Sequence, residues 1–157
     1  MKKGLKIGVA SLATLVAFGV TGCGKVEAPV YTNTYIGDYH YENAGTTYGV
    51  QLAVSVVDDK ITAISVISDK ETGYKSVSDA MGNWTEDKVN NWKNNEKNYF
   101  AQFIGKTVAE VKAMKATVSG FVGTVEGADA QSGATLSSAR GLLALKAALA
   151  NYESSNK

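Results

Sequence analysis

The sequence has few of the residues that usually build metal or redox centres. Its 157 residues include one cysteine, one histidine, one proline and one arginine. A single cysteine excludes disulfides and paired-cysteine metal or haem motifs within the chain, and a lone histidine cannot build a metal site. The other basic residues are lysines scattered singly, so the sequence lacks the basic stripe that binds a phosphate backbone. We therefore expect no metal and no nucleic-acid partner.

Motifs of familiar enzymes are missing too. The sequence shows no carboxylate pair or Ser/His/Asp set suited to hydrolysis. It also lacks the G-x-G-x-x-G pattern of nicotinamide-binding domains. We assign no catalytic residue, and sequence alone leaves open whether the chain is an enzyme.

The N-terminus has the layout of a secretory signal. Three lysines precede an uncharged stretch from Ile7 to Val20, which is shorter than the about 20 apolar residues of a membrane-spanning helix. The stretch ends in Val20-Thr21-Gly22-Cys23, which resembles the bacterial lipobox. We predict a signal peptide over 1–22 and a lipid on Cys23 that anchors the protein outside the cytoplasm; the alternative is a free or buried thiol.

The remaining length suits one globular domain. Residues 23–34 hold the only proline and no apolar period, which predicts a lipidated tether before a domain over 35–157. Apolar residues alternate from Thr47 to Val56, and Asp58-Asp59-Lys60 then marks a turn before the β-branched segment Ile61–Ile67. With the aromatic run Tyr35–Tyr41, these segments predict a meander of three antiparallel strands.

Helical patterns follow the strands. Apolar residues recur at helical spacing over 85–103 and 135–151, and Thr107 with Glu110 matches a capping box that opens a short helix. Three glycines punctuate 116–128, for which we expect a strand plus a loop. The fold class predicted is α+β, a small antiparallel sheet packed against three helices.

The segment before the last helix is the most informative. Asp129-Ala130-Gln131-Ser132-Gly133-Ala134-Thr135 is followed by small hydroxyl residues and resembles the flavinylation motif of the FMN-binding domain family. That family includes flavin-bearing components of the Rnf complex and of the sodium-pumping NADH:quinone oxidoreductase, together with extracellular electron-transfer lipoproteins. The resemblance implies that a flavin transferase joins the phosphate of FMN to the Thr135 hydroxyl. It assigns to the cofactor site Thr135, Asp129, Ser132, Gly133, Ala134, Leu136 and Ser137.

A second segment extends the resemblance. The strand pair from Tyr48 to Ile67, followed by Asp69-Lys70-Glu71-Thr72-Gly73-Tyr74, is similar to the family's strand pair and its E-T-P-G loop beside the flavin. This chain lacks the proline of that loop. The resemblance adds Glu71, Thr72 and Gly73 to the cofactor site.

The resemblance implies a membrane-anchored electron carrier that passes electrons from a membrane quinol or dehydrogenase to an external acceptor. The residues agree with it, because a threonine at a helix entrance would place a phosphate beside unpaired backbone N–H groups and the positive end of the helix dipole. The alternative is a lipoprotein that binds flavin or another small molecule without a covalent bond. Thr135 or Ser132 would then only cap the helix.

Two other groups have alternative interpretations. The aromatic residues Trp84, Trp92, Tyr99 and Phe100 could stack on a flavin, although an aromatic stripe at helical spacing more often belongs to the core. His40 lies among tyrosines on an expected edge strand, where surface contacts with tyrosine are favoured over a chemical role.

Overall fold

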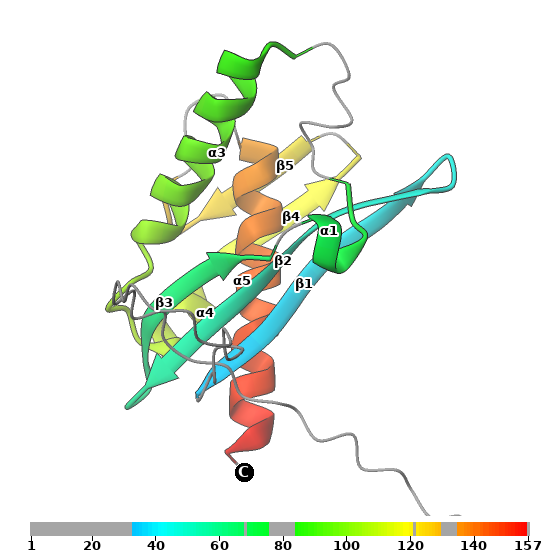
Figure 1. Cartoon of the computed structure of the whole chain (residues 1–157). Helices are drawn as coiled ribbons and strands as arrows, with labels where there is room; N and C mark the ends of the chain where they lie inside the picture. The colour runs from blue at the N-terminus through cyan, green and yellow to red at the C-terminus, as the bar shows by residue number, and fades with distance from the viewer. Residues whose placement is uncertain (1–32, 68, 76–83, 121, 130–134, 157) are drawn as a thin grey trace, which may run out of the picture.

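Three antiparallel strands form the main sheet of the computed structural model, which describes residues 33–67, 69–75, 84–120, 122–129 and 135–156. The strands lie in the order β1–β2–β3, as Figure 1 shows. They are β1 (Thr34–Asn43), β2 (Thr46–Val57) and β3 (Lys60–Val66). The predicted meander is confirmed.

Two-residue turns connect these strands. Ala44 and Gly45 have φ angles of 49° and 77°, and Asp58 and Asp59 have 49° and 62°. Positive φ at both central residues matches the right-handed twist of the flanking strands, which is why such tight turns are favoured in hairpins. The turn predicted at Asp58-Asp59 is therefore present.

Three of the described helices follow at the predicted places, and a short one forms over Asp69–Thr72, where the sequence suggested a loop. The described helices are α1 (Asp69–Thr72), α3 (Glu86–Ala101), α4 (Val108–Ala113) and α5 (Thr135–Ser155). Thr85 caps α3 by accepting a hydrogen bond from the Lys88 backbone N–H. Thr107 and Glu110 form both halves of a capping box on α4, so this prediction is confirmed as well.

The segment 116–128 differs from the prediction of one strand plus a loop. It forms a hairpin of two strands, β4 (Lys115–Ser119) and β5 (Val122–Glu126). Glycine weakens a strand, which is why the sequence suggested irregularity, but Gly123 lies inside β5 opposite Val118. Packing of α5 against both strands overrides the local preference.

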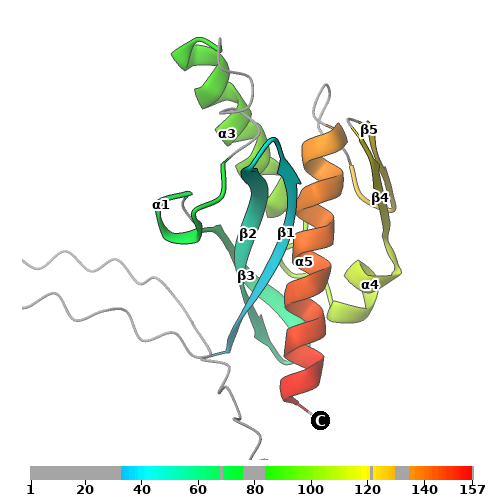
Figure 2. The same ribbon diagram turned by 90° about the vertical axis from the view of Figure 1, so that its right-hand side faces the viewer.

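The long helix α5 is the centre of the domain. It packs against β1 and β2 on one side and against β4 and β5 on the other, and Figure 2 shows it between the two sheets. Its buried residues form the middle of the core together with side chains from the sheet and α3. Fully buried large side chains are Phe103, Leu52, Ile61, Leu142, Leu145, Leu149, Val54 and Val111. The predicted α+β class is confirmed.

The aromatic stripe of α3 belongs mostly to this core. Tyr99 and Phe100 are buried, and their rings pack edge to face with centroids 5.6 Å apart. Trp92, about two turns earlier on the helix, is half-buried. Among the described helices, none is long and apolar enough to span a membrane.

Candidate functional site at the start of α5

The start of α5 lies at one end of the domain, and the helix begins at Thr135. The first N–H groups of a helix have no partner within the helix, so this end has a positive electrostatic potential. Ser132, Gly133 and Ala134 of the predicted site lie outside the described residues, as does Cys23. For Thr135 and Leu136 the structure describes the helical backbone only.

Asp129 is held by the end of α3. The side-chain amide of Gln102 donates to the Asp129 carbonyl oxygen at 3.0 Å and accepts from its backbone N–H at 2.9 Å. These two bonds fix the backbone while the Asp129 residue stays exposed. A carboxylate in this position, six residues before Thr135, is accessible to another protein.

A shallow hollow lies between α3 and the first turn of α5. It is lined by Trp92, Asn95, Glu96, Tyr99, Phe100, Ser137 and Ser138. The indole N–H of Trp92 donates to the Ser137 hydroxyl at 3.3 Å. Ser137, a predicted site residue, therefore faces an aromatic wall close to the start of the helix.

Two buried polar atoms near this end, the Tyr99 hydroxyl oxygen and the Arg140 Nε, have no hydrogen-bond partner among the described residues. Burial raises the pKa of the Tyr99 phenol well above its ordinary value. Buried polar atoms without partners are rare in folded proteins, and strain, a functional role or a bound water or ion can account for them. Sequence reasoning did not assign either residue to the site. The available signals were the aromatic stripe that includes Tyr99 and a lone arginine within a largely apolar helix.

Glu71, Thr72 and Gly73 lie in a different place. Glu71 and Thr72 end α1, and Gly73 continues with a φ of 72°, a value that favours glycine. The chain then returns to the edge of β2, where the Gly49 N–H donates to the Lys75 carbonyl and the Lys75 N–H donates to the Thr47 carbonyl. Figure 2 shows α1 and α5 on opposite sides of the three-stranded sheet, so the sheet separates the two predicted parts of the site.

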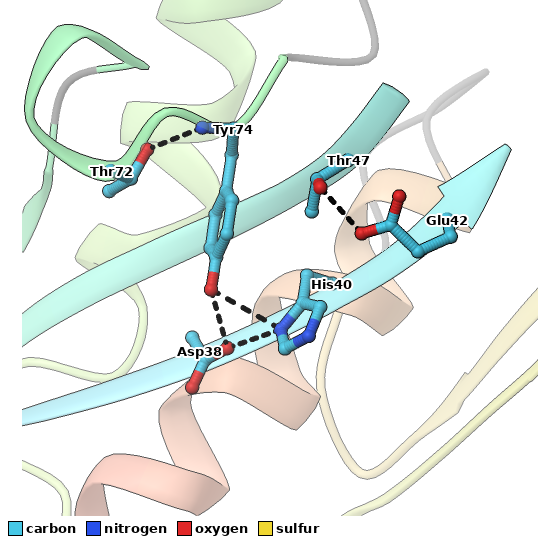
Figure 3. A network of polar contacts seen from close by, with 6 residues as sticks. All are labelled: Asp38, His40, Glu42, Thr47, Thr72 and Tyr74. Atoms are coloured by element: carbon cyan, nitrogen blue, oxygen red, sulfur yellow. Dashed lines mark hydrogen bonds and ion pairs between the residues drawn. The ribbon is translucent and has the colours of Figure 1, made fainter. Parts of the chain in front are cut away.

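A polar network holds the loop after α1 to the sheet, as Figure 3 shows. The Tyr74 hydroxyl donates to Asp38 Oδ2 at 3.1 Å, and the same oxygen lies 2.6 Å from His40 Nδ1. The Tyr74 and His40 rings stack with centroids 5.2 Å apart. Burial raises the pKa of the Tyr74 phenol, with a further contribution from its hydrogen bond to Asp38. His40 thus contacts a tyrosine, as expected from its place on an edge strand.

Neither metal-ligand clusters among the described residues nor comparisons with known proteins indicate a further site. No group of three or more His, Cys, Asp or Glu side chains suited to a metal ion occurs among the described residues. Comparisons of the chain with protein-family models, curated proteins and solved structures give no match.

Proposed function

We propose that this protein is an exported lipoprotein, anchored through Cys23, that bears FMN on Thr135 and carries electrons. The observation that supports it most is the place of Thr135, directly after the Asp129–Ala134 motif and at the first residue of a 21-residue helix. A phosphate attached there would lie among the free N–H groups of the first turn and at the positive end of the helix dipole.

The residues around the start of α5 suit this group. The hollow offers the half-buried Trp92 ring for contact with a planar ring system. The Tyr99 hydroxyl has no partner within the described part of the protein and could donate to a ligand. FMN, when bound, accepts and donates electrons in one or two steps, and the protein's part is to hold it and adjust its potential.

Glu71, Thr72 and Gly73 have a less direct place in the proposal. Because the sheet lies between their loop and α5, we assign the phosphate to the start of α5 and assign the loop no contact with it. This loop could contact the isoalloxazine ring of FMN only if the cofactor extends past the end of the sheet.

Attachment requires a flavin transferase as modifying partner. In the proposed step the Thr135 Oγ bonds to the phosphorus of the FMN half of FAD and loses its proton. The pyrophosphate bond breaks, and AMP leaves. A covalent bond suits a protein outside the cell, where a dissociated cofactor would be lost by dilution.

The test is co-expression with a flavin transferase followed by mass spectrometry and in-gel fluorescence under denaturing conditions. The wild type is expected to gain the mass of one esterified FMN and to fluoresce. Thr135→Ala should lose both signals, Thr135→Ser should keep them, and Thr124→Ala on the exposed face of β5 serves as the matched control. Covalent flavin on Thr135→Ala protein would contradict the assignment.

A second candidate function is reversible binding of flavin or another small molecule, with Thr135 only capping α5. The buried Tyr99 hydroxyl, which has no partner among the described residues, favours this alternative, because a ligand could accept its hydrogen bond without any covalent bond. Flavin that copurifies with the protein but leaves it on denaturation would identify this function and exclude the covalent one.

The anchor and the electron partners have separate tests. Lipid on Cys23 predicts partition of the wild type, and not of Cys23→Ser, into a detergent phase. Reduction of the flavinylated protein by membranes that contain quinol, followed by reoxidation by a soluble acceptor, would support the carrier role. No reduction by any membrane fraction would contradict it.

A further inference from the structure

Arg140 is a buried cation near the start of α5. Only 3% of its surface is exposed, and a guanidinium stays charged at any pH at which the protein is folded. Among the described residues its guanidinium contacts Tyr41 of β1, whose ring centroid lies 4.3 Å from the guanidinium carbon and whose hydroxyl lies 3.4 Å from Nη1. Within the described part of the chain, the Nε atom has no hydrogen-bond partner.

No carboxylate neutralises this charge in the part of the chain that the structure describes. The ion pairs found there join His40 to Asp38, Lys112 to Glu153 and Lys115 to Glu126. Tyr41 offers only a ring face and a neutral hydroxyl. A buried charge without a counter-charge is costly, so a protein that keeps one usually has a use for it.

The surroundings add to the positive potential. Arg140 follows Thr135 by five residues, about 7.5 Å along the helix axis, and helical side chains lean toward the N-terminus. The guanidinium therefore adds to the field of the helix dipole at the start of α5. Tyr99 provides independent evidence, since its buried hydroxyl also has no partner in the described segments and Tyr99 lines the hollow at this same end.

We propose that Arg140 supplies the positive charge that stabilises an anionic group of the ligand held at the start of α5. The inference rests on the proposed function in taking this ligand to be FMN, which offers two such groups, its phosphate and its reduced ring. Arg140 would then position the ligand and adjust its reduction potential. This role explains why the domain keeps a buried charge that has no counter-charge among the described residues.

The first test compares the melting temperatures of wild type and Arg140→Met, each without flavin and with flavin attached. Without flavin, Arg140→Met is expected to melt at or above the wild type, because an apolar side chain replaces an unpaired buried charge. Flavin attachment should raise the melting temperature of the wild type more than that of the variant. A purely structural arginine would instead lower stability equally in both forms.

Matched variants distinguish the effect of losing any positive charge on α5 from the effect of losing the charge of Arg140. Lys146→Met removes one positive charge from the same helix, where Nζ donates to the Met114 carbonyl, and should gain as much from flavin as the wild type. Arg140→Lys keeps the charge and should retain part of the gain. Should Arg140→Met fail to fold, Arg140→Gln replaces it as the neutral variant.

The second test identifies the anionic group. In a Thr135→Ala background, free FMN and riboflavin are titrated against two proteins, one that keeps Arg140 and one that carries Arg140→Met. If the phosphate is the partner, the preference for FMN should fall roughly tenfold or more without the arginine. If the reduced ring is the partner, the preference should persist while the midpoint potential of covalently flavinylated Arg140→Met protein becomes more negative.

Failure of this inference differs from failure of the proposed function. The role of Arg140 alone is overturned if the wild type acquires flavin and Arg140→Met behaves in the same way. The variant would then show the same ligand preference, the same midpoint potential and the same rise in melting temperature on flavin attachment. A wild type that acquires no flavin and binds no free FMN overturns both.

Discussion

Gly37 of β1 lies directly against the backbone of α5 at Ala148. A Cβ built on Gly37 would stand 2.1 Å from the Ala148 nitrogen and 2.3 Å from the Ala144 carbonyl oxygen. These atoms belong to helix backbone and cannot move aside as a flexible side chain would. The absence of a side chain at this position allows the helix and the sheet to approach closely.

Gly37→Ala should therefore destabilise the domain by about 1–3 kcal/mol or more, as overpacking does in a tight core. Urea unfolding monitored by tryptophan fluorescence measures this loss. Gly45→Ala is the control, because Gly45 has a φ of 77° and no atom within 4 Å of the added Cβ. It should cost roughly 1 kcal/mol through backbone strain alone. Equal losses in both variants would contradict the close packing at Gly37.

Tyr99→Phe should stabilise the flavin-free protein by about 1 kcal/mol, because it removes a buried hydroxyl for which the described residues provide no partner. Burial also raises the pKa of Tyr99 above its ordinary value of 10.0. Below pH 10 the tyrosine is neutral in both folded and unfolded chains. Above pH 10 only the unfolded chain ionises readily, so wild-type stability falls. The advantage of Tyr99→Phe should thus grow above pH 10, and a constant difference in unfolding free energy would argue against a raised pKa.

The capping box of α4 gives a prediction at acid pH. Glu110 accepts hydrogen bonds from the Thr107 backbone N–H at 2.7 Å and from its hydroxyl at 2.8 Å. The backbone bond is the main reason that the pKa of Glu110 is lowered. Its stabilising effect should be present above the ordinary pKa of 4.5 and should be lost as the pH falls through the lowered value.

Thr107→Ala should cost about 1 kcal/mol at pH 7, as removal of an N-cap does. Glu110→Gln should also destabilise at pH 7, and its difference from wild type should shrink below the ordinary pKa of 4.5. Chemical unfolding at neutral and at acid pH tests both variants. The double variant should lose less than the two single losses together, since the residues share the same bonds; strict additivity would exclude the capping box.

His40 is the only histidine, so its ring signals in an NMR spectrum need no assignment. Because Asp38 Oδ2 lies 2.6 Å from Nδ1, we expect the neutral ring to have its proton on Nδ1. Asp38→Asn should shift the population toward the Nε2–H tautomer. Nitrogen chemical shifts distinguish the tautomers, and a wild type in the Nε2–H form would show that the contact is not a hydrogen bond from the ring.

Tyr74→Phe should loosen the loop after α1. The change removes the hydroxyl that donates to Asp38, while the aromatic ring can still stack on His40. Exchange of the Lys75 and Gly49 amide hydrogens should become faster, because these groups pair the loop with β2. Amides in the β1–β2 ladder serve as the internal reference, and unchanged exchange at Lys75 and Gly49 would mean that Tyr74 does not hold the loop.

The sequence predicted the meander, the capped helix α4 and the start of α5 well, because each depends on local patterns. Alternating residues specify strands, Asp58-Asp59 suits a tight turn, and Thr107 with Glu110 lie within one helical turn. The β4–β5 hairpin was missed in part because its glycines weaken the local signal. Its second strand depends on packing against α5, a contact that only the folded chain provides.

The candidate site was predictable only where it depends on a continuous segment. Asp129, Ser137 and the helix start at Thr135 follow each other in the sequence. Arg140 contacts Tyr41 across 99 residues of sequence, and the Tyr99 hydroxyl is buried without a partner among the described residues only when α3 packs on α5. The position of Glu71 and Gly73 across the sheet from α5 is a property of topology, which local resemblance does not specify.

The first strand and the last helix meet at the end of the domain remote from Thr135. Tyr35 packs edge to face on Tyr152, with ring centroids 5.2 Å apart, and from there the first residue of α5 lies about 25 Å away along the helix axis. With a lipid on Cys23 as proposed, the polypeptide would enter the domain at its membrane-proximal pole. The proposed flavin on Thr135 would lie at the opposite pole, where acceptors that never touch the bilayer could reach it. Contact of this flavin with a donor in the membrane would require the domain to tilt on its tether.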